Sequence, residues 1–193
     1  TGLVILTVGL FALRARLQPE PLPVFGRVGT FALTNQLGQP ISAETLRGNV
    51  WVANIIFTRC PGPCLLMTRS LATLQSRLTE RDPVRLVSLT ADPEHDTAGV
   101  MRSYAEGFGA DAERWQFLTG SKAELYRLAM NDLKLTAEET DPERRESLND
   151  LFIHSTTFVL VDAAGQVRGF FDGTDEAAPE RLRGAIRRLQ REH

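Results

Sequence analysis

The two cysteines of this 193-residue chain are the side chains best suited to chemistry. Cys60 and Cys64 lie between an apolar, β-prone run at residues 49–57 and a run whose apolar residues recur at helical spacing. Near a helix N-terminus, unpaired N–H groups and the helix dipole favour a thiolate and predict a lowered pKa. If the segment is helical, residues four apart lie about 6 Å from each other on one face. This spacing allows a disulfide or a shared metal ion.

Three interpretations of the cysteine pair stay open at this point: a structural disulfide, a redox dithiol, and half of a soft-metal site. The structural disulfide is the weakest of them. Closing so short a loop removes only about 2 kcal/mol of chain entropy, against nearly 5 kcal/mol for a long loop.

Composition and charge limit the remaining possibilities. With 42% hydrophobic and 24% charged residues, the chain can build one domain with a sizeable core. A formal charge of -2 argues against general nucleic-acid binding, which needs a basic face. We interpret residues 1–17, which begin with an apolar run, as a truncated N-terminal membrane anchor; a signal-peptide core or a buried helix are the alternatives. The proline-rich residues 18–23 then form a spacer, and residues 24–193 form the domain.

Alternating patterns along the domain predict an α/β fold. A hairpin at residues 31–41 and a short helical turn at 42–46 precede the buried strand at 49–57 and its helix. Strands at 84–90 and 115–118, each followed by a helix, then a long loop at 131–150, strands at 151–161 and 166–171, and a helix at 179–190 complete the pattern. This order predicts a thioredoxin-like mixed sheet flanked by helices, with an N-terminal β-hairpin extension. The cysteines would follow the carboxyl end of a central strand, where open α/β sheets bind ligands.

One of the three histidines is a candidate third ligand. His193 is terminal, and His95 lies in a charged turn that suits a solvated side chain. His154 interrupts an apolar stretch predicted to lie near the cysteine-bearing strand. Two soft thiolates with one imidazole favour copper, whereas structural zinc generally takes four protein ligands and ranks second.

Several separated motifs carry a family resemblance that extends over about residues 24–190. They are Phe31-Ala32-Leu33 with Gly38, Gly48-Asn49-Val50-Trp51 leading to Ile56-Phe57-Thr58, Cys60-Pro61-x-x-Cys64, Asp92-Pro93-x-x-Asp96-Thr97, and His154-Ser155 before Phe158-Val159-Leu160-Val161-Asp162. In this order they resemble the Sco/SenC family of copper-binding, thioredoxin-fold proteins that assist assembly of the copper centre of cytochrome c oxidase.

The resemblance implies that Cys60, Cys64 and His154 bind Cu(I) or Cu(II). It also implies a domain that faces the periplasm from a single N-terminal membrane anchor. Asp92 and Asp96 match a family motif beside the site, and we expect them to cap a helix rather than bind metal.

The cysteine motif departs from the family pattern. Family members usually carry an acidic residue between the cysteines and a proline after the second, where this chain has Gly62 and Leu65, with Pro63 inside the motif. Loss of a carboxylate beside the thiolates would change copper affinity and thiol pKa.

These features lead us to expect a copper metallochaperone that delivers copper to the copper-bearing subunit of cytochrome c oxidase. The alternative is an enzyme, a thiol-disulfide reductase of that subunit in which Cys60 and Cys64 are catalytic. A peroxiredoxin-like peroxidase and a purely structural interaction domain rank lower. Another periplasmic copper chaperone and a thioredoxin-like reductase are further candidate partners.

Overall fold

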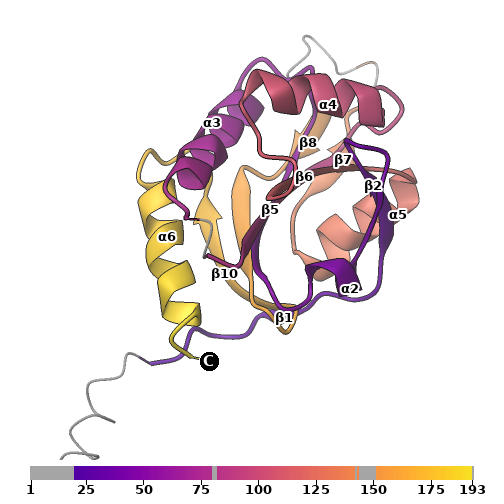
Figure 1. The fold of residues 1–193 in the computed structure, drawn as a ribbon. Coiled ribbons are helices and arrows are strands. Elements are labelled where there is room, and N and C mark those ends of the chain that lie inside the picture. The colour runs from indigo at the N-terminus through magenta and orange to yellow at the C-terminus, as the bar shows by residue number, and fades with distance from the viewer. Residues whose placement is uncertain (1–19, 80–81, 142, 144–150, 193) are drawn as a thin grey trace, which may run out of the picture.

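The chain forms a curled, mostly antiparallel sheet with helices on both faces (Figure 1). The computed structural model describes residues 20–79, 82–141, 143 and 151–192. For residues 153 and 154 it describes the backbone but not the side chains. The predicted anchor at residues 1–17 lies outside this part. The described elements are β1 (Gly26–Arg27), β2 (Ala32–Asn35), β3 (Pro40–Ser42), α2 (Ala43–Leu46), β4 (Val50–Ile56), α3 (Pro63–Ser76), β5 (Val84–Thr90), α4 (Ala98–Gly107), β6 (Trp115–Thr119), α5 (Lys122–Tyr126), the π-helical turn η1 (Arg127–Asp132), β7 (Ala137–Glu139), β8 (Phe152–His154), β9 (Thr157–Val161), β10 (Gln166–Asp172) and α6 (Ala178–Leu189).

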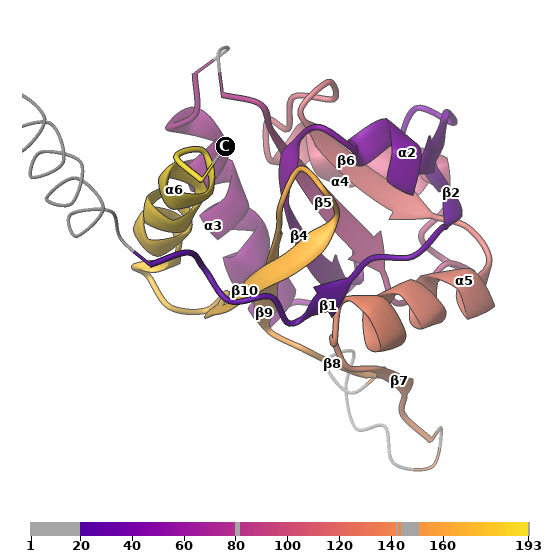
Figure 2. The ribbon, with the colours of Figure 1, turned by 90° about the horizontal axis from the view of Figure 1, so that it is seen from below.

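Eight strands form the main sheet in the order β1-β10-β9-β4-β5-β6-β2-β3. β4, β5 and β6 are parallel neighbours, and β9 runs antiparallel to β4. Every residue of β4 is buried, which explains the unbroken apolar run in its sequence. Figure 2 shows α3 and α6 together on one side of the sheet and α5 on the other. The predicted thioredoxin-like mixed sheet is confirmed.

The cysteine-bearing helix α3 packs through the stripe expected from its sequence. Met67, Leu71 and Leu74 are completely buried. Leu78, the fourth residue of the predicted stripe, lies beyond the end of the helix and is partly buried. Because β4 ends at Ile56 and α3 begins at Pro63, the six residues between them lie at the carboxyl end of the parallel strands.

The N-terminal hairpin is also present. β2 pairs antiparallel with β3, and it joins the edge of the main sheet through β6. The turn depends on Asn35, whose Oδ1 accepts the N–H groups of Leu37 and Gln39, both at 2.9 Å. Gly38 supplies the positive φ of 78° that the turn requires.

The segment predicted as a long loop at residues 131–150 contains more structure than its sequence suggests. The helix that begins at α5 continues as η1 to Asp132, and β7 pairs antiparallel with β8. The loop prediction is therefore wrong for the described part of this segment. Each of these two strands has only three residues, too few to show an alternating pattern.

Residues 20–23 of the predicted spacer lie against the folded domain. The guanidinium of Arg168 donates to the carbonyls of Leu22 and Pro23, and Glu192 accepts the N–H of Leu22 at 2.8 Å. Arg168 is also ion-paired with buried Asp162 at 2.8 Å. These contacts fix the start of the domain to β10 and to Glu192, which lies three residues after α6. Within the described ranges, no helix combines the length and apolar character needed to cross a membrane.

Candidate metal centre

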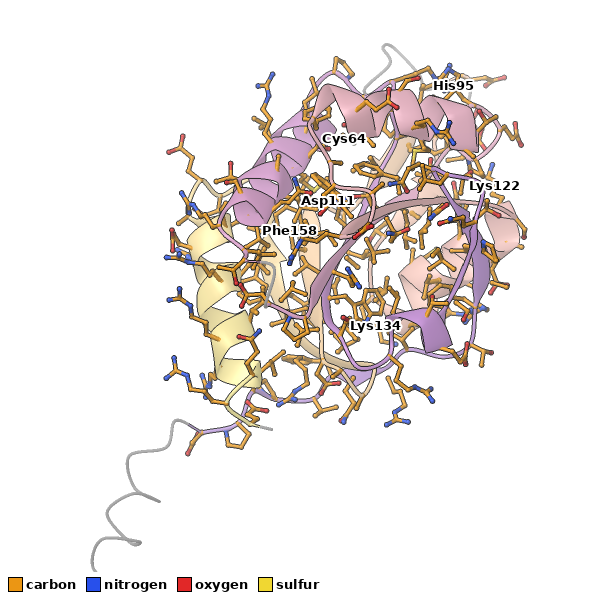
Figure 3. All side chains as sticks on the ribbon, viewed as in Figure 1. Cys64, His95, Asp111, Lys122, Lys134 and Phe158 are labelled. Atoms are coloured by element: carbon orange, nitrogen blue, oxygen red, sulfur yellow. The ribbon has the colours of Figure 1, made fainter. Side chains whose placement is uncertain are left out.

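The two cysteines come together at the carboxyl end of β4, although they do not share a helix. Cys64 is the second residue of α3, whereas Cys60 lies in the preceding loop, which turns back through a hydrogen bond from the Cys60 N–H to the Phe57 carbonyl at 3.1 Å. Both are thiols, joined by a side-chain hydrogen bond. Their exposed fractions are 2% for Cys60 and 0% for Cys64. Figure 3 labels Cys64 where α3 and α4 converge. A bend, rather than the predicted helical turn, thus brings the sulfurs together.

The pKa of Cys64 is raised rather than lowered. The hydrogen bond with Cys60 is the largest cause, and burial is the second. A backbone hydrogen bond from Phe57 acts in the opposite direction but is weaker. The prediction of a lowered pKa is therefore wrong for Cys64 in the dithiol, because the neighbouring thiol and the loss of water outweigh the helix N-terminus.

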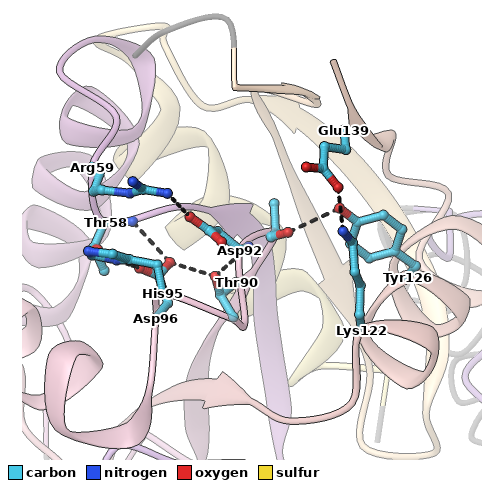
Figure 4. Close-up of polar contacts among 10 residues, drawn as sticks. Thr58, Arg59, Thr90, Asp92, His95, Asp96, Lys122, Tyr126 and Glu139 are labelled. Atoms are coloured by element: carbon cyan, nitrogen blue, oxygen red, sulfur yellow. Dashed lines mark hydrogen bonds and ion pairs between the residues drawn. The ribbon is translucent and has the colours of Figure 1, made fainter. Parts of the chain in front are cut away.

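Residues 57–62, between β4 and α3, form the cysteine loop. Asp96 holds the start of this loop from the neighbouring β5–α4 connection (Figure 4). Its fully buried carboxylate accepts the Thr58 N–H at 3.1 Å and the Thr58 hydroxyl at 2.5 Å. The hydroxyl of Thr90, at the end of β5, donates to the same carboxylate at 2.6 Å. Asp96 therefore ties the loop to the adjacent parallel strand two residues before Cys60.

Asp92 holds the next residue of the same loop. Its carboxylate, 9% exposed, pairs with the Arg59 guanidinium at 2.5 Å. Both aspartates of the Asp92-Pro93-x-x-Asp96-Thr97 motif thus bind the cysteine loop, and the expectation that they cap a helix is wrong. Thr97 is the N-cap of α4, accepting the Val100 N–H at 3.4 Å.

His95 lies at the edge of this network and is exposed to solvent, as expected. Its side chain is 40% exposed, and its Nδ1 lies 3.0 Å from Asp96. His95, Asp92 and Asp96 bring three potential ligand atoms within 4.8 Å of one another. Because both carboxylates already accept hydrogen bonds from the cysteine loop, we assign this cluster a structural role.

A second pair of side chains supports the first turn of α3. The Thr68 hydroxyl donates to the Cys64 carbonyl at 2.8 Å and lies 2.9 Å from the Tyr104 hydroxyl on α4. Burial raises the pKa of Tyr104 to about 12. The neutral phenol therefore links α4 to the helix that carries Cys64.

His154 is placed by its backbone and by its neighbours in sequence. It ends β8, opposite Ala137 of β7. Two residues earlier, the Phe152 ring lies 5.1 Å from that of Phe57, the residue that follows β4. Two residues later, the Thr156 carbonyl accepts the Gly173 N–H at 2.7 Å. The imidazole lies outside the described part of the structure, so its approach to the sulfurs stays a prediction.

The donor types present suit a soft metal. The two thiols are in contact, so on losing their protons they could hold one metal ion between two thiolates. Thiolate sulfur selects Cu(I) and zinc over hard cations such as magnesium or calcium. A neutral imidazole on the adjacent segment would make a three-coordinate set. Sequence reasoning found these three candidate ligands but missed the roles of Asp96, Asp92 and Thr68, which depend on contacts 33 to 38 residues apart or on an interhelical contact.

Comparison with known families identifies the family of this chain. The family model described as SCO1/SenC matches residues 24–191. The chain belongs to the SCO1/SenC family. Two curated relatives of this Sco-family protein are a SCO1 protein homologue from Bacillus subtilis, 33% identical over 79% of this chain and 77% of the relative, and a candidate copper-binding protein from Stutzerimonas stutzeri, 31% identical over 83% and 79%.

Solved structures give the same result for the fold. A SCO1/SenC family lipoprotein from Bacillus anthracis superposes with a TM-score of 0.77 at 28% identity, covering 89% of this chain and 99% of that protein. BsSco, described as a member of the Sco family of cytochrome c oxidase assembly proteins with a disulfide switch, gives a TM-score of 0.74 at 28% identity, covering 88% and 98%. The chain therefore has the fold of these solved Sco-family proteins.

Proposed function

We propose that this Sco-family protein is a copper metallochaperone that binds one copper ion through Cys60, Cys64 and His154. The observation that carries the proposal is the contact between the two thiols beside the His154-bearing segment. A relative described as a candidate copper-binding protein supports copper over zinc. Membership of BsSco in a family of cytochrome c oxidase assembly proteins supports the copper-bearing oxidase subunit as the partner.

Burial of both sulfurs bears on how copper would be transferred. With Cys60 at 2% and Cys64 at 0% exposure, a partner's ligands reach the site only after part of its cover moves. A low coordination number then leaves room for incoming thiolates to replace the ligands one at a time.

A membrane-anchored location in the bacterial periplasm is part of the proposal. The apolar run supports an N-terminal anchor at residues 1–17. The proline-rich residues that follow would be a short spacer, whose last residues, Leu22 and Pro23, are tied to the domain by Arg168. A relative described as a lipoprotein supports attachment to a membrane. Residues 24–193 would then form the copper-binding domain.

A thiol-disulfide reductase is the second candidate, favoured by the hydrogen bond that already joins the two thiols. In this reaction one thiolate attacks a partner disulfide, and the other resolves the mixed disulfide. The partner receives two electrons and becomes a dithiol, while Cys60 and Cys64 become a disulfide. The disulfide switch described for BsSco supports such an exchange. A thioredoxin-like reductase would supply the electrons that restore the dithiol.

Anaerobic titration of the reduced protein with Cu(I), in competition with a chromophoric chelator, tests the main proposal. The wild type is expected to take up one tight equivalent, and His154→Ala is expected to bind at least 10-fold more weakly. His95→Ala is the matched control, because His95 touches Asp96 rather than the sulfurs. Equal affinities of wild type and His154→Ala, together with rapid reduction of a partner disulfide, would instead support the reductase.

A further inference from the structure

Gly173 lies between helix α3, which carries Cys64, and the segment that follows His154. It directly follows β10, and its N–H donates to the Thr156 carbonyl at 2.7 Å, which extends the pairing of β10 with β9 by one residue. On its other side is Met67 of α3, one helical turn after Cys64. Gly173 is thus in contact with α3, which carries Cys64, and with the backbone two residues after His154.

The space at Gly173 admits no side chain. A Cβ built there would lie 2.8 Å from the Thr156 carbonyl oxygen, 2.8 Å from Met67 Cγ and 3.0 Å from Met67 Sδ. Its φ is not in the positive region, so steric contact rather than backbone conformation requires glycine. Met67 is completely buried, which limits its movement. The Thr156 carbonyl belongs to the backbone only two residues after His154.

We propose that Gly173 is a positioning residue for copper binding, since it allows the His154-bearing segment to approach α3 closely enough for one ion to be shared. Relief of contacts at 2.8 Å requires shifts of about 0.7 Å, because non-bonded carbon contacts are optimal at about 3.5–4.0 Å. Metal sites tolerate deviations of only about 0.2 Å in ligand distance. A methyl group at residue 173 would therefore move His154 out of range without changing any ligand. This inference rests on the proposed function.

Gly173→Ala tests the proposal, with Gly184→Ala as the matched control, because a Cβ at Gly184 in α6 meets no atom within 4 Å. Gly173→Ala is expected to weaken Cu(I) binding about 10-fold, and the Cu(II) form is expected to lose nitrogen hyperfine coupling in its paramagnetic resonance spectrum. Gly184→Ala is expected to match the wild type in both measurements. In a His154→Ala background, Gly173→Ala should cause no further loss of affinity, because its effect acts through His154.

The outcomes separate this inference from the proposed function. If His154→Ala weakens copper binding but Gly173→Ala does not, the inference about Gly173 is wrong and the ligand assignment stands. The inference would also be overturned if Gly173→Ala lowered copper affinity as much in the His154→Ala background as it does in the wild type. If His154→Ala itself has no effect, the proposed function fails.

A measurement on the unmodified protein covers the case in which Gly173→Ala does not fold. Copper binding through His154 should restrain the neighbouring Thr156 carbonyl and its hydrogen bond. We expect the Gly173 amide to exchange with solvent at least 3-fold more slowly in the Cu(I)-loaded protein than in the reduced, metal-free protein. The Gly38 amide, in the hairpin turn at the sheet edge, is the internal reference and should not change. An unchanged rate at Gly173 would overturn the proposal.

Discussion

Asp96 offers the sharpest test of how the cysteine loop is held. Substitution by alanine removes the acceptor for three donors: the Thr58 N–H, the Thr58 hydroxyl and the Thr90 hydroxyl. A hydrogen bond to a charged group contributes about 1.5–3 kcal/mol when its loss leaves a buried donor unpaired. Thr90 is completely buried, whereas half-buried Thr58 can be rehydrated. Removing the buried charge offsets part of the loss, so we expect Asp96→Ala to lower the free energy of unfolding by about 3 kcal/mol.

Chemical denaturation and thermal unfolding both measure this effect. A loss of about 3 kcal/mol corresponds to a fall in Tm of about 6–12 °C for a domain of this size. Asp96→Asn retains one acceptor oxygen and should lose about half as much. Because Thr58 lies two residues before Cys60, copper affinity should fall about 10-fold in Asp96→Ala even where the protein stays folded.

Glu94→Ala is the matched control, since it removes an exposed carboxylate from the same turn. Its effect on unfolding should stay within about 0.5 kcal/mol of zero. If Asp96→Ala cost less than about 1 kcal/mol, the hydrogen bonds to Thr58 and Thr90 would contribute little, and the reasoning that Asp96 fixes the loop would be refuted.

Three single substitutions test the burial of Tyr104, the contact of Phe152 with Phe57 and the backbone conformation of Gly48. Burial raises the pKa of Tyr104 from 10.0 to about 12, so the stabilisation that the neutral phenol gives is present below pH 10 and is lost as the pH rises from 10 to 12. Tyr104→Phe should remove about 2–3 kcal/mol of this pH dependence of the free energy of unfolding, measured by denaturation at several pH values. An unchanged pH dependence would contradict the burial of the hydroxyl. Phe152→Ala should destabilise the protein by about 3 kcal/mol through loss of the contact with Phe57, and a change below about 1 kcal/mol in urea denaturation would show that the ring is not packed there. Gly48 has a φ of 83°, so Gly48→Ala should cost about 1 kcal/mol in the same assay, and a neutral result would mean that the turn relaxes.

Much of the fold is predictable because its strongest signals are local. The unbroken apolar run at residues 49–57 predicts a central strand, and the structure buries all of β4. Helical spacing likewise predicts the inward face of α3, where Met67 is completely buried. The hairpin follows from Gly38 and its neighbours, because a turn type depends on a few adjacent residues.

The site is less predictable because it depends on contacts between distant segments. Residue spacing places Cys60 and Cys64 on one helix, but helix α3 begins only at Pro63 and a bend closes the distance. An aspartate before a helix predicts a cap, whereas Asp96 finds its donors on a strand and loop that the sequence does not show to be adjacent. The steric demand at Gly173 leaves no sequence signal beyond the glycine itself.

X-ray absorption at the copper edge of the Cu(I)-loaded protein tests the central claim most directly. We expect the wild type to show two sulfur ligands and one nitrogen ligand. His154→Ala should lose the nitrogen and keep both sulfurs, while Cys60→Ser should lose one sulfur. A nitrogen ligand that persists in His154→Ala, or a single sulfur in the wild type, would contradict copper binding by Cys60, Cys64 and His154.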